Sequence, residues 1–391
     1  MESLRQRGEF VEFLVTDGVN VDGIADHDKT NLFQINKLGR LMLLPFFPCL
    51  LLQMIFTGGY AGRSFKQALD RYWHAYGLHF VISRKLFSCK PRGVLVSSDH
   101  SLLPCAFVIA ANGHHVPTFY LQHACVTEKF PPLMTTYALL DGHDALQKYA
   151  SVGPTETTAY LVGITRYDEV AGKENRSNQT RRVGICTSIA DDVSRTQQLI
   201  KDVATSDVDL QITLRPHPRT DKEVLRQYNE LVEQYDLMLS STDETAFEFL
   251  TRQDAIIAGA SSIALEAALL QVLPLHYVLN DTDSDWYGFI EKGLCKSFDD
   301  TASLVEYLRH AKPLEAIDRE LTRFYCETVG TPWHGKSTEL ASSVITTIAA
   351  GQQPSSKYWR QVDLACVAGS PIQAFGLQER ESGFRATKGK S

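Results

Sequence analysis

Short β-branched runs alternate with helical segments along most of this chain, and no other feature limits its fold as strongly. A strand, a helix and a second strand within one short span form a βαβ unit, whose strands are parallel. The helical stretch 101–112 ends at Asn112-Gly113, a pair that stops helices. We therefore expect an α/β fold, whose first strands are expected at 94–96, 116–121, 137–140 and 159–162.

A polar segment divides this alternation into two series. Residues 171–182 contain almost nothing that could be buried, so we expect an interdomain linker there. Two Rossmann-like, doubly wound parallel-sheet domains, 1–170 and 183–350, would then face a ligand cleft at the carboxyl ends of their strands. The aperiodic segment 351–391 is expected to be a loosely ordered tail. In the second domain we expect strands at 183–186, 210–214, 255–257 and 275–279, and helices at 193–203, 223–235 and 263–270.

The overall composition argues against several classes of protein. Hydrophobic residues make up 44% of the chain and charged residues 22%, which is typical of globular proteins. The formal net charge of -7 argues against nucleic acid as a partner, because binding phosphate backbones requires concentrated positive charge. Eight cysteines without a C-x-x-C pair indicate reduced thiols rather than a zinc site. No apolar leader is visible, so we expect a cytoplasmic protein.

Residues 41–56 form an unusually apolar segment. Pro45 and Pro48 interrupt it, and it is shorter than the roughly 20 residues that span a bilayer. Three interpretations remain open: a buried or site-flanking segment, a transmembrane helix, and an anchor at the inner face of the cytoplasmic membrane. Basic residues support the anchor and complete a membrane-proximal region, 41–92: Arg63, Lys66, Arg71, Arg84, Lys85, Lys90 and Arg92, against Asp70 alone.

The sharpest local signal for chemistry is Leu214-Arg215-Pro216-His217-Pro218-Arg219, at the end of an expected strand. Prolines on both sides of His217 favour an extended backbone, in which alternate side chains share a face. Arg215, His217 and Arg219 would then point the same way and suit a phosphate or diphosphate. A basic surface turn that merely ends a strand is the alternative.

Two further strand ends in the second domain carry small hydroxyl residues. Gly259 lets the backbone turn closely after one strand, and Ser261 or Ser262 can cap the helix that follows and offer its N-terminus to an anion. Thr187 and Ser188 follow the first strand of the same domain. Serine-capped strand-to-helix turns are common, so the position of these residues beside His217 is what favours a binding site.

In the first domain, Asp99, His123 and Glu128 follow two neighbouring strands. A carboxylate or imidazole at such a position can take a proton from an attacking hydroxyl. We expect these three side chains to be neighbours on the cleft wall, with Asp99, or failing it Glu128, as the base.

These residues resemble the motifs of a superfamily of bacterial surface-polymer transferases. It includes CDP-glycerol glycerophosphotransferases, capsule Kdo transferases and bacterial sialyltransferases. The resemblance covers roughly residues 94–345, although Ala124 replaces a usual glycine and Gly163 lacks the usual following proline. It is carried by Gln122-His123, Phe130-Pro131-Pro132-Leu133, Asp141-Gly142, Gly163-Ile164-Thr165-Arg166-Tyr167-Asp168, Arg215-Pro216-His217-Pro218, Ser261-Ser262 and Gly335-Lys336-Ser337.

The resemblance implies the GT-B fold and a metal-independent, inverting glycosyltransferase without a cofactor. The second domain would hold a nucleotide-activated sugar or polyol phosphate, CMP- or CDP-linked, with His217 and Ser261-Ser262 on the phosphates and Glu266 at the ribose. The first domain would present a growing surface polysaccharide, such as capsule or lipopolysaccharide, or a lipid-linked acceptor. Asp281-Thr282-Asp283 matches the Asp-x-Asp pattern of a metal-binding motif, but its neighbours indicate a solvated loop.

Two rival functions remain open. A nucleotide-sugar epimerase of the same double fold would need no acceptor, and the apolar, basic N-terminal region counts against it. A catalytically inactive polysaccharide-binding module would not need the phosphate-binding residues of the second domain.

Overall fold

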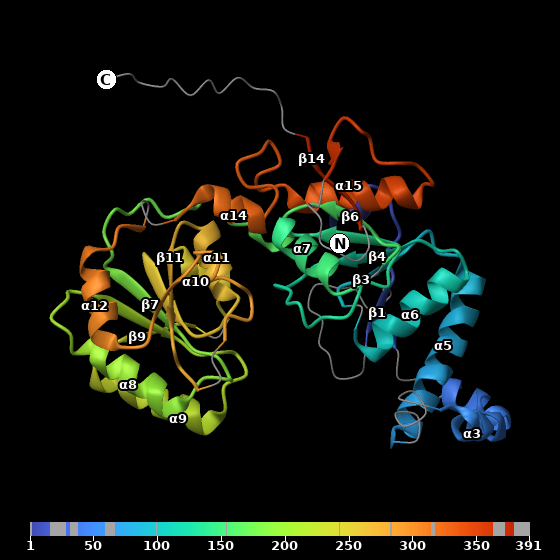
Figure 1. Cartoon of the computed structure of the whole chain (residues 1–391), viewed down its shortest axis with the longest axis horizontal. Helices are drawn as coiled ribbons and strands as arrows, with labels where there is room; N and C mark the ends of the chain where they lie inside the picture. The colour runs from blue at the N-terminus through green and yellow to red at the C-terminus, as the bar shows by residue number, and fades with distance from the viewer. Residues whose placement is uncertain are drawn as a thin grey trace.

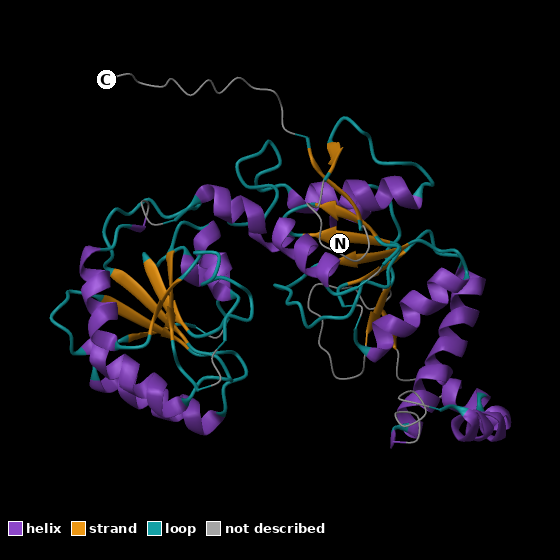
Figure 2. Ribbon diagram, viewed as in Figure 1, coloured by secondary structure: helices purple, strands orange, loops and turns teal. Residues whose placement is uncertain are grey.

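The computed structural model describes residues 2–15, 29–31, 38–58, 67–98, 100–153, 155–241, 243–281, 284–313, 317–362 and 372–378. Its core is a pair of six-stranded sheets, each packed between helices (Figures 1 and 2). This confirms the predicted α/β architecture of two domains built on parallel sheets.

The second sheet is parallel throughout and has the strand order β12-β11-β10-β7-β8-β9. Helices cover both faces, so the strand β10 is buried along its whole length. Its strands are β7 (Arg182–Cys186), β8 (Gln211–Arg215), β9 (Met238–Leu239), β10 (Ala255–Ala258), β11 (Leu273–Tyr277) and β12 (Lys296–Phe298). One face carries α8 (Val193–Ala204), α9 (Lys222–Gln234) and α12 (Thr301–His310), and the other carries α10 (Ala246–Leu250) and α11 (Ile263–Leu269).

The first sheet has the strand order β13-β14-β6-β5-β4-β3, in which only β13 is antiparallel to its neighbour. Helix α7 (His143–Ser151) packs on one face and α15 (Ser337–Ala349) on the other. The strands are β3 (Val94–Val96), β4 (Thr118–Leu121), β5 (Tyr137–Leu140), β6 (Thr158–Leu161), β13 (Trp359–Gln361) and β14 (Gln373–Leu377).

The end of the chain differs from the loose tail that the sequence suggested. Strand β14 pairs with β6, and Trp359, Ala374 and Leu377 are buried in the core of the first sheet. Helix α15, which lies within the expected second domain, also packs on the first sheet (Figure 1). Buried apolar side chains stabilise this segment. Their spacing is too irregular to show a helical or strand period in the sequence.

Two tight crossings fix how the second half of the chain passes back to the first. Helix α14 (Arg319–Tyr325) runs beside α7, and a Cβ atom at Gly142 would lie 2.7 Å from the carbonyl oxygen of Phe324. A Cβ atom at Gly163, whose φ is +79°, would lie 2.3 Å from Oγ1 of Thr328. Only glycine fits these two positions without moving backbone or buried hydroxyls.

The segment 171–182 joins the first sheet to β7 and is attached to the second domain. The backbone amide of Asn175 donates to the carbonyl of Leu270 at 2.7 Å, and the hydroxyl of Thr180 donates to that of Ala311 at 3.1 Å. The short helix η3 (Thr165–Tyr167) precedes it.

The N-terminal region packs beside the first sheet. Among the described residues, strands β1 (Phe13–Val15) and β2 (Lys29–Asn31) pair with each other alone. Helices α5 (Leu69–Cys89) and α6 (Leu102–Gly113) form a separate apolar cluster. Among the described residues, no helix combines the length and the apolar character needed to cross a membrane. The other elements are α1 (Glu2–Gln6), η2 (Leu44–Phe46) and α3 (Phe47–Phe56).

Candidate functional site

The chain order of the second sheet reverses between β7 and β10. From β7 the chain adds β8 and β9 on one side, and it then returns to add β10, β11 and β12 on the other. Cys186 and Ala258 are register partners at the ends of β7 and β10, so the loops that follow leave the same edge side by side. Ligands of open α/β sheets bind at such a reversal.

Gly259 and Asp191 lie against each other at this reversal. A Cβ atom at Gly259 would lie 2.8 Å from Oδ1 of Asp191, so a larger residue would displace that carboxylate. Oδ2 of Asp191 accepts a hydrogen bond from the backbone amide of Ser188 at 2.6 Å. Thr187, the residue before it, is buried, and its amide donates to the carbonyl of Arg215. The predicted residues Thr187 and Ser188 thus lie at the reversal; Asp191 was not among the predicted site residues.

Ser261 and Ser262 lie between β10 and α11, as the sequence indicated. The hydroxyl of Ser261 accepts the amide of Ile263 at 3.4 Å, whereas the side chain of Ser262 makes no capping hydrogen bond. Both residues are partly exposed.

His217 lies two strands away from β10, in the turn after β8. Neighbouring strands are about 4.8 Å apart, so the ends of β8 and β10 are roughly 10 Å apart. The backbone amide of Arg219 donates to Nδ1 of His217 at 3.0 Å. Partial burial, followed by the charge of Arg219, lowers the pKa of His217. The neutral ring therefore carries its proton on Nε2, where it can be donated to an anion.

The structure does not keep Arg215 and Arg219 on one face with His217. Strand β8 ends at Arg215, and the next residues form a turn in which the amide of Thr220 donates to the carbonyl of His217. A turn breaks the alternation of side chains on which that prediction depended. Arg219 is exposed.

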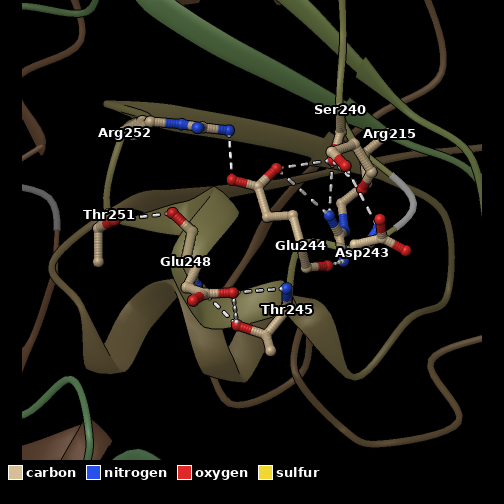
Figure 3. A network of polar contacts seen from close by, with 9 residues as sticks. Arg215, Ser240, Asp243, Glu244, Thr245, Glu248, Thr251 and Arg252 are labelled. Atoms are coloured by element: carbon tan, nitrogen blue, oxygen red, sulfur yellow. Dashed lines mark hydrogen bonds and ion pairs between the residues drawn. The ribbon is translucent and has the colours of Figure 1, made fainter.

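The guanidinium of Arg215 belongs to a polar network inside the second domain (Figure 3). Its Nη1 donates to the hydroxyl of Ser240 at 2.7 Å, and its Nη2 donates to the carbonyl of Glu244 at 2.9 Å. The carboxylate of Glu244 also pairs with Arg252. Glu244 is almost buried, with a side-chain exposure of 9%, and Arg252 and Arg215 together compensate its charge. In this structure the guanidinium of Arg215 stabilises the loop after β9, and it is not free to bind an anion.

A small cavity lies beside Ser261, between α11 and the loop after β11. Aromatic side chains of that loop form much of its wall, and Asp285 shapes the loop by accepting the amides of Phe289 and Ile290. The lining residues are Gly259, Ala260, Ser261, Ala264, Leu275, His276, Ser284, Asp285, Trp286, Tyr287, Phe289, Ile290 and Cys295.

The loop after β4 and helix α7 of the first domain contact the loop after β11 of the second. Nζ of Lys129 lies 3.5 Å from the centre of the Trp286 ring, and Nζ of Lys148 donates to the carbonyl of Tyr287 at 2.8 Å. The predicted residues His123 and Glu128 follow β4 and have exposed side chains. The predicted residue Asp99 lies outside the described residues.

Arg166 joins the two domains at the centre of this contact. Its Nη1 donates to the carbonyl of His123 at 2.8 Å, and its Nε lies 3.1 Å from Oε1 of Glu266 on α11. Burial raises the pKa of Glu266, and the Arg166 charge opposes that shift. The structure therefore pairs Glu266 with Arg166, whereas the resemblance implied a contact with the ribose.

Asp141, at the end of β5, was not predicted as a site residue. Burial raises its pKa to about 8, against the opposing charge of Arg166. Within the described part of the chain, its Oδ2 atom has no hydrogen-bond partner. The Asp-Gly pair after an apolar strand was the only sequence signal, because burial of the carboxyl depends on both domains.

Asp168 ends the segment 163–168 of the motif pattern and has a structural role. Its two carboxylate oxygens accept the backbone amides of Ser337 at 2.8 Å and Thr338 at 2.6 Å, at the start of α15. A carboxylate at a helix N-terminus satisfies amides that have no partner within the helix. The segment 163–168 is thus a structural junction as well as the source of Arg166.

No protein-family model and no curated protein matches this chain. Among solved structures, the chain is similar to a putative UDP-N-acetylglucosamine 2-epimerase from Listeria monocytogenes, with a TM-score of 0.51 and 14% identity over 72% of this chain and 81% of that one. The S. aureus MnaA–UDP structure gives 0.48 and 15%, over 72% and 81%. The wall teichoic acid polymerase TagF, as its H444N variant with CDPG, gives 0.46 and 10%, over 66% and 73%. At such identities the likeness is one of fold, and the chain has a GT-B-type fold.

Proposed function

We propose that this protein is a glycosyltransferase that moves a sugar or polyol phosphate from a nucleotide-activated donor to a saccharide or lipid-linked acceptor. One observation carries the proposal. Hydroxyls lie at the topological reversal of the second sheet, the His217 imidazole lies on the same edge two strands from β10, and the loop that bears His123 lies across the domain contact from them.

In this proposal the second domain binds the donor. The phosphates lie between Ser261-Ser262 and His217, where the Nε2 proton of a neutral imidazole and two hydroxyls can donate hydrogen bonds. Donors placed where negative charge accumulates on a departing phosphate lower the barrier to transfer. The nucleobase of a CMP- or CDP-linked donor would lie beside Ser261, against the aromatic residues of the loop after β11.

The first domain supplies the base that deprotonates the acceptor hydroxyl. Of the three candidates, we favour His123, because Arg166 holds its backbone and is itself paired with Glu266 on the helix that follows Ser261-Ser262. This connection sets the position of the His123 loop relative to the donor. Glu128 lies on the same loop, and Asp99 remains a sequence-based candidate.

A donor panel tests the proposal. Purified protein would be incubated with CMP-, CDP-, UDP- and GDP-activated sugars or polyols, with and without saccharide acceptors, and the release of nucleotide and the products would be followed. Acceptor-dependent release of nucleotide and of an extended acceptor is the expected result.

The shared fold with the Listeria structure keeps nucleotide-sugar epimerisation as the second candidate. Conversion of a donor to its isomer without an acceptor would establish that alternative and overturn the transferase proposal. Binding of a saccharide without turnover of any donor would indicate an inactive binding module instead.

A further inference from the structure

The segment 41–56 carries a concentration of exposed apolar side chains. Phe56 is 82% exposed and Leu41 is 64% exposed, although both lie in or beside helical backbone. A folded protein rarely leaves so many large apolar groups together in water unless a partner covers them. We call this surface the apolar tip; it comprises Leu41, Leu44, Phe46, Leu52, Ile55 and Phe56.

The apolar tip is attached to the molecule through α5. A Cβ atom at Gly39 would lie 2.3 Å from the carbonyl oxygen of Gly77, so two glycines allow the backbones to cross in contact. The ring centroids of Phe47 and Trp73 lie 5.0 Å apart. Helix α3 consequently extends beyond α5 and lies away from both sheets (Figure 1).

Further exposed aromatic residues continue along α5 from this attachment. Tyr76, Phe80 and Phe87 are exposed, and their spacing of four and seven residues places them on one side of the helix. This side lies next to the positions of α5 that contact the segment 38–47. The exposed apolar surface is therefore larger than the tip alone.

Basic residues lie beside the apolar tip, and the exposed acid Asp70 precedes Arg71 in the chain. The sequence contains no Asp or Glu from residue 41 to residue 69, and the exposed residues Arg40 and Arg71 lie on the two segments that meet at the Gly39–Gly77 crossing. At the other end of α5, Lys85 pairs with Glu12 and Arg92 with Glu9, whereas Arg84 and Lys90 are exposed. Of the predicted basic stretch, Arg63 and Lys66 lie outside the described residues, and Arg71 lies beside the tip.

We propose that the apolar tip inserts into the interface of an anionic lipid bilayer, with Arg40 and Arg71 at the headgroups. Helix α3 has 10 residues, about half the length that spans a bilayer, so it would lie in the interface rather than cross it. A second copy of the chain is a weaker fit, because two tips in contact would bring their arginines together, whereas anionic headgroups attract them. This inference does not depend on the proposed enzymatic activity.

Co-sedimentation of the full chain with lipid vesicles tests the inference. Vesicles of phosphatidylcholine alone would be compared with vesicles containing phosphatidylglycerol, at low and high salt. We expect the protein to pellet with the anionic vesicles and to be released by salt. Phe56→Glu should lower the vesicle partition coefficient about tenfold or more, the factor expected when one buried phenylalanine is lost. Leu52→Glu provides a second variant at an exposed position.

Phe10→Glu is the matched control, because Phe10 is 81% exposed and lies outside the apolar tip. Arg71→Gln should weaken anionic binding about fivefold at low salt, and Arg176→Gln, at an exposed arginine of the segment 171–182, should not. Wild-type protein that stays in the supernatant with every vesicle would overturn the proposal. Equal losses from Phe56→Glu and Phe10→Glu would overturn it as well. So would a concentration-dependent dimer that Phe56→Glu dissociates, without any vesicle binding.

Discussion

Arg166 of the first domain lies between Glu266 of the second domain and the backbone carbonyl of His123, at 3.1 Å and 2.8 Å respectively. The side chain of Glu266 is only 12% exposed. A single guanidinium therefore neutralises a nearly buried carboxylate of one domain and fixes a loop of the other. This contact links the proposed donor and acceptor sides of the molecule.

Arg166→Gln should reduce the free energy of unfolding by about 2 kcal/mol, because it leaves Glu266 nearly buried without a cation. Glu266→Gln should cost less, since it removes the charge that needs compensation. The double variant should be more stable than the sum of the two single losses predicts. Denaturant unfolding of the three variants measures this coupling, and strictly additive losses would show that the pair contributes nothing.

Asp141 should make stability depend on pH. Its pKa rises from 3.8 to about 8, so between these values the folded protein holds a proton that the unfolded chain has lost. Wild-type stability should therefore fall as the pH rises through this window, with a slope of up to about 1.4 kcal/mol per pH unit, and level off above it. Asp141→Asn keeps the shape of the neutral acid and should lose this slope. Asp209→Asn, at an exposed position, is the control. Thermal unfolding between about pH 5 and pH 9, which includes the upper part of this pH window, measures the slope. If Asp141 titrates as an ordinary carboxyl, the variant and the wild type will show the same pH dependence.

His217→Ala should slow transfer by about two orders of magnitude, the loss expected when a hydrogen bond to a departing phosphate is removed. The fold should be unaffected, because His217 lies in a surface turn. His310→Ala removes an exposed histidine of α12 and serves as the control. A large drop in melting temperature with undiminished turnover of the folded fraction would assign His217 a structural role.

The base is identified by comparing His123→Asn, Glu128→Gln and Asp99→Asn. We expect His123→Asn to lower kcat far more than it raises the KM for the donor, because a base acts on the acceptor hydroxyl during the reaction. Steady-state kinetics with saturating acceptor measure the difference. If Asp99→Asn or Glu128→Gln shows that behaviour while His123→Asn does not, the role belongs to that carboxylate.

Metal removal should leave turnover unchanged, because the proposal assigns the phosphates to His217 and to hydroxyls. Asp281, the first residue of the Asp-x-Asp pattern, pairs with Arg195 in the structure. Activity after dialysis against EDTA, compared with the same sample after Mg²⁺ is restored, gives the test. Activity that depends on Mg²⁺ would require a different account of the donor site.

The local helices and strands, and the parallel direction of the strands, follow from the sequence alone. Apolar runs such as 183–186 and 255–257 correspond closely to β7 and β10, because a strand buried on both faces must be apolar throughout. The position of Ser261-Ser262 after β10 followed from that assignment. The turn at His217 did not follow from the sequence. The prolines beside it predict an extended backbone, whereas the amide of Thr220 donates to the carbonyl of His217 and closes a turn.

The tertiary structure alone decided which distant residues meet. No local pattern shows that β14 pairs with β6, that Arg166 neutralises Glu266, or that Arg215 compensates Glu244. Each depends on residues far apart in the sequence, where burial removes water and makes an opposite charge or an apolar neighbour necessary. The same reason explains Asp141, whose carboxyl is an ordinary acid in the sequence and becomes a weak one only when both domains enclose it.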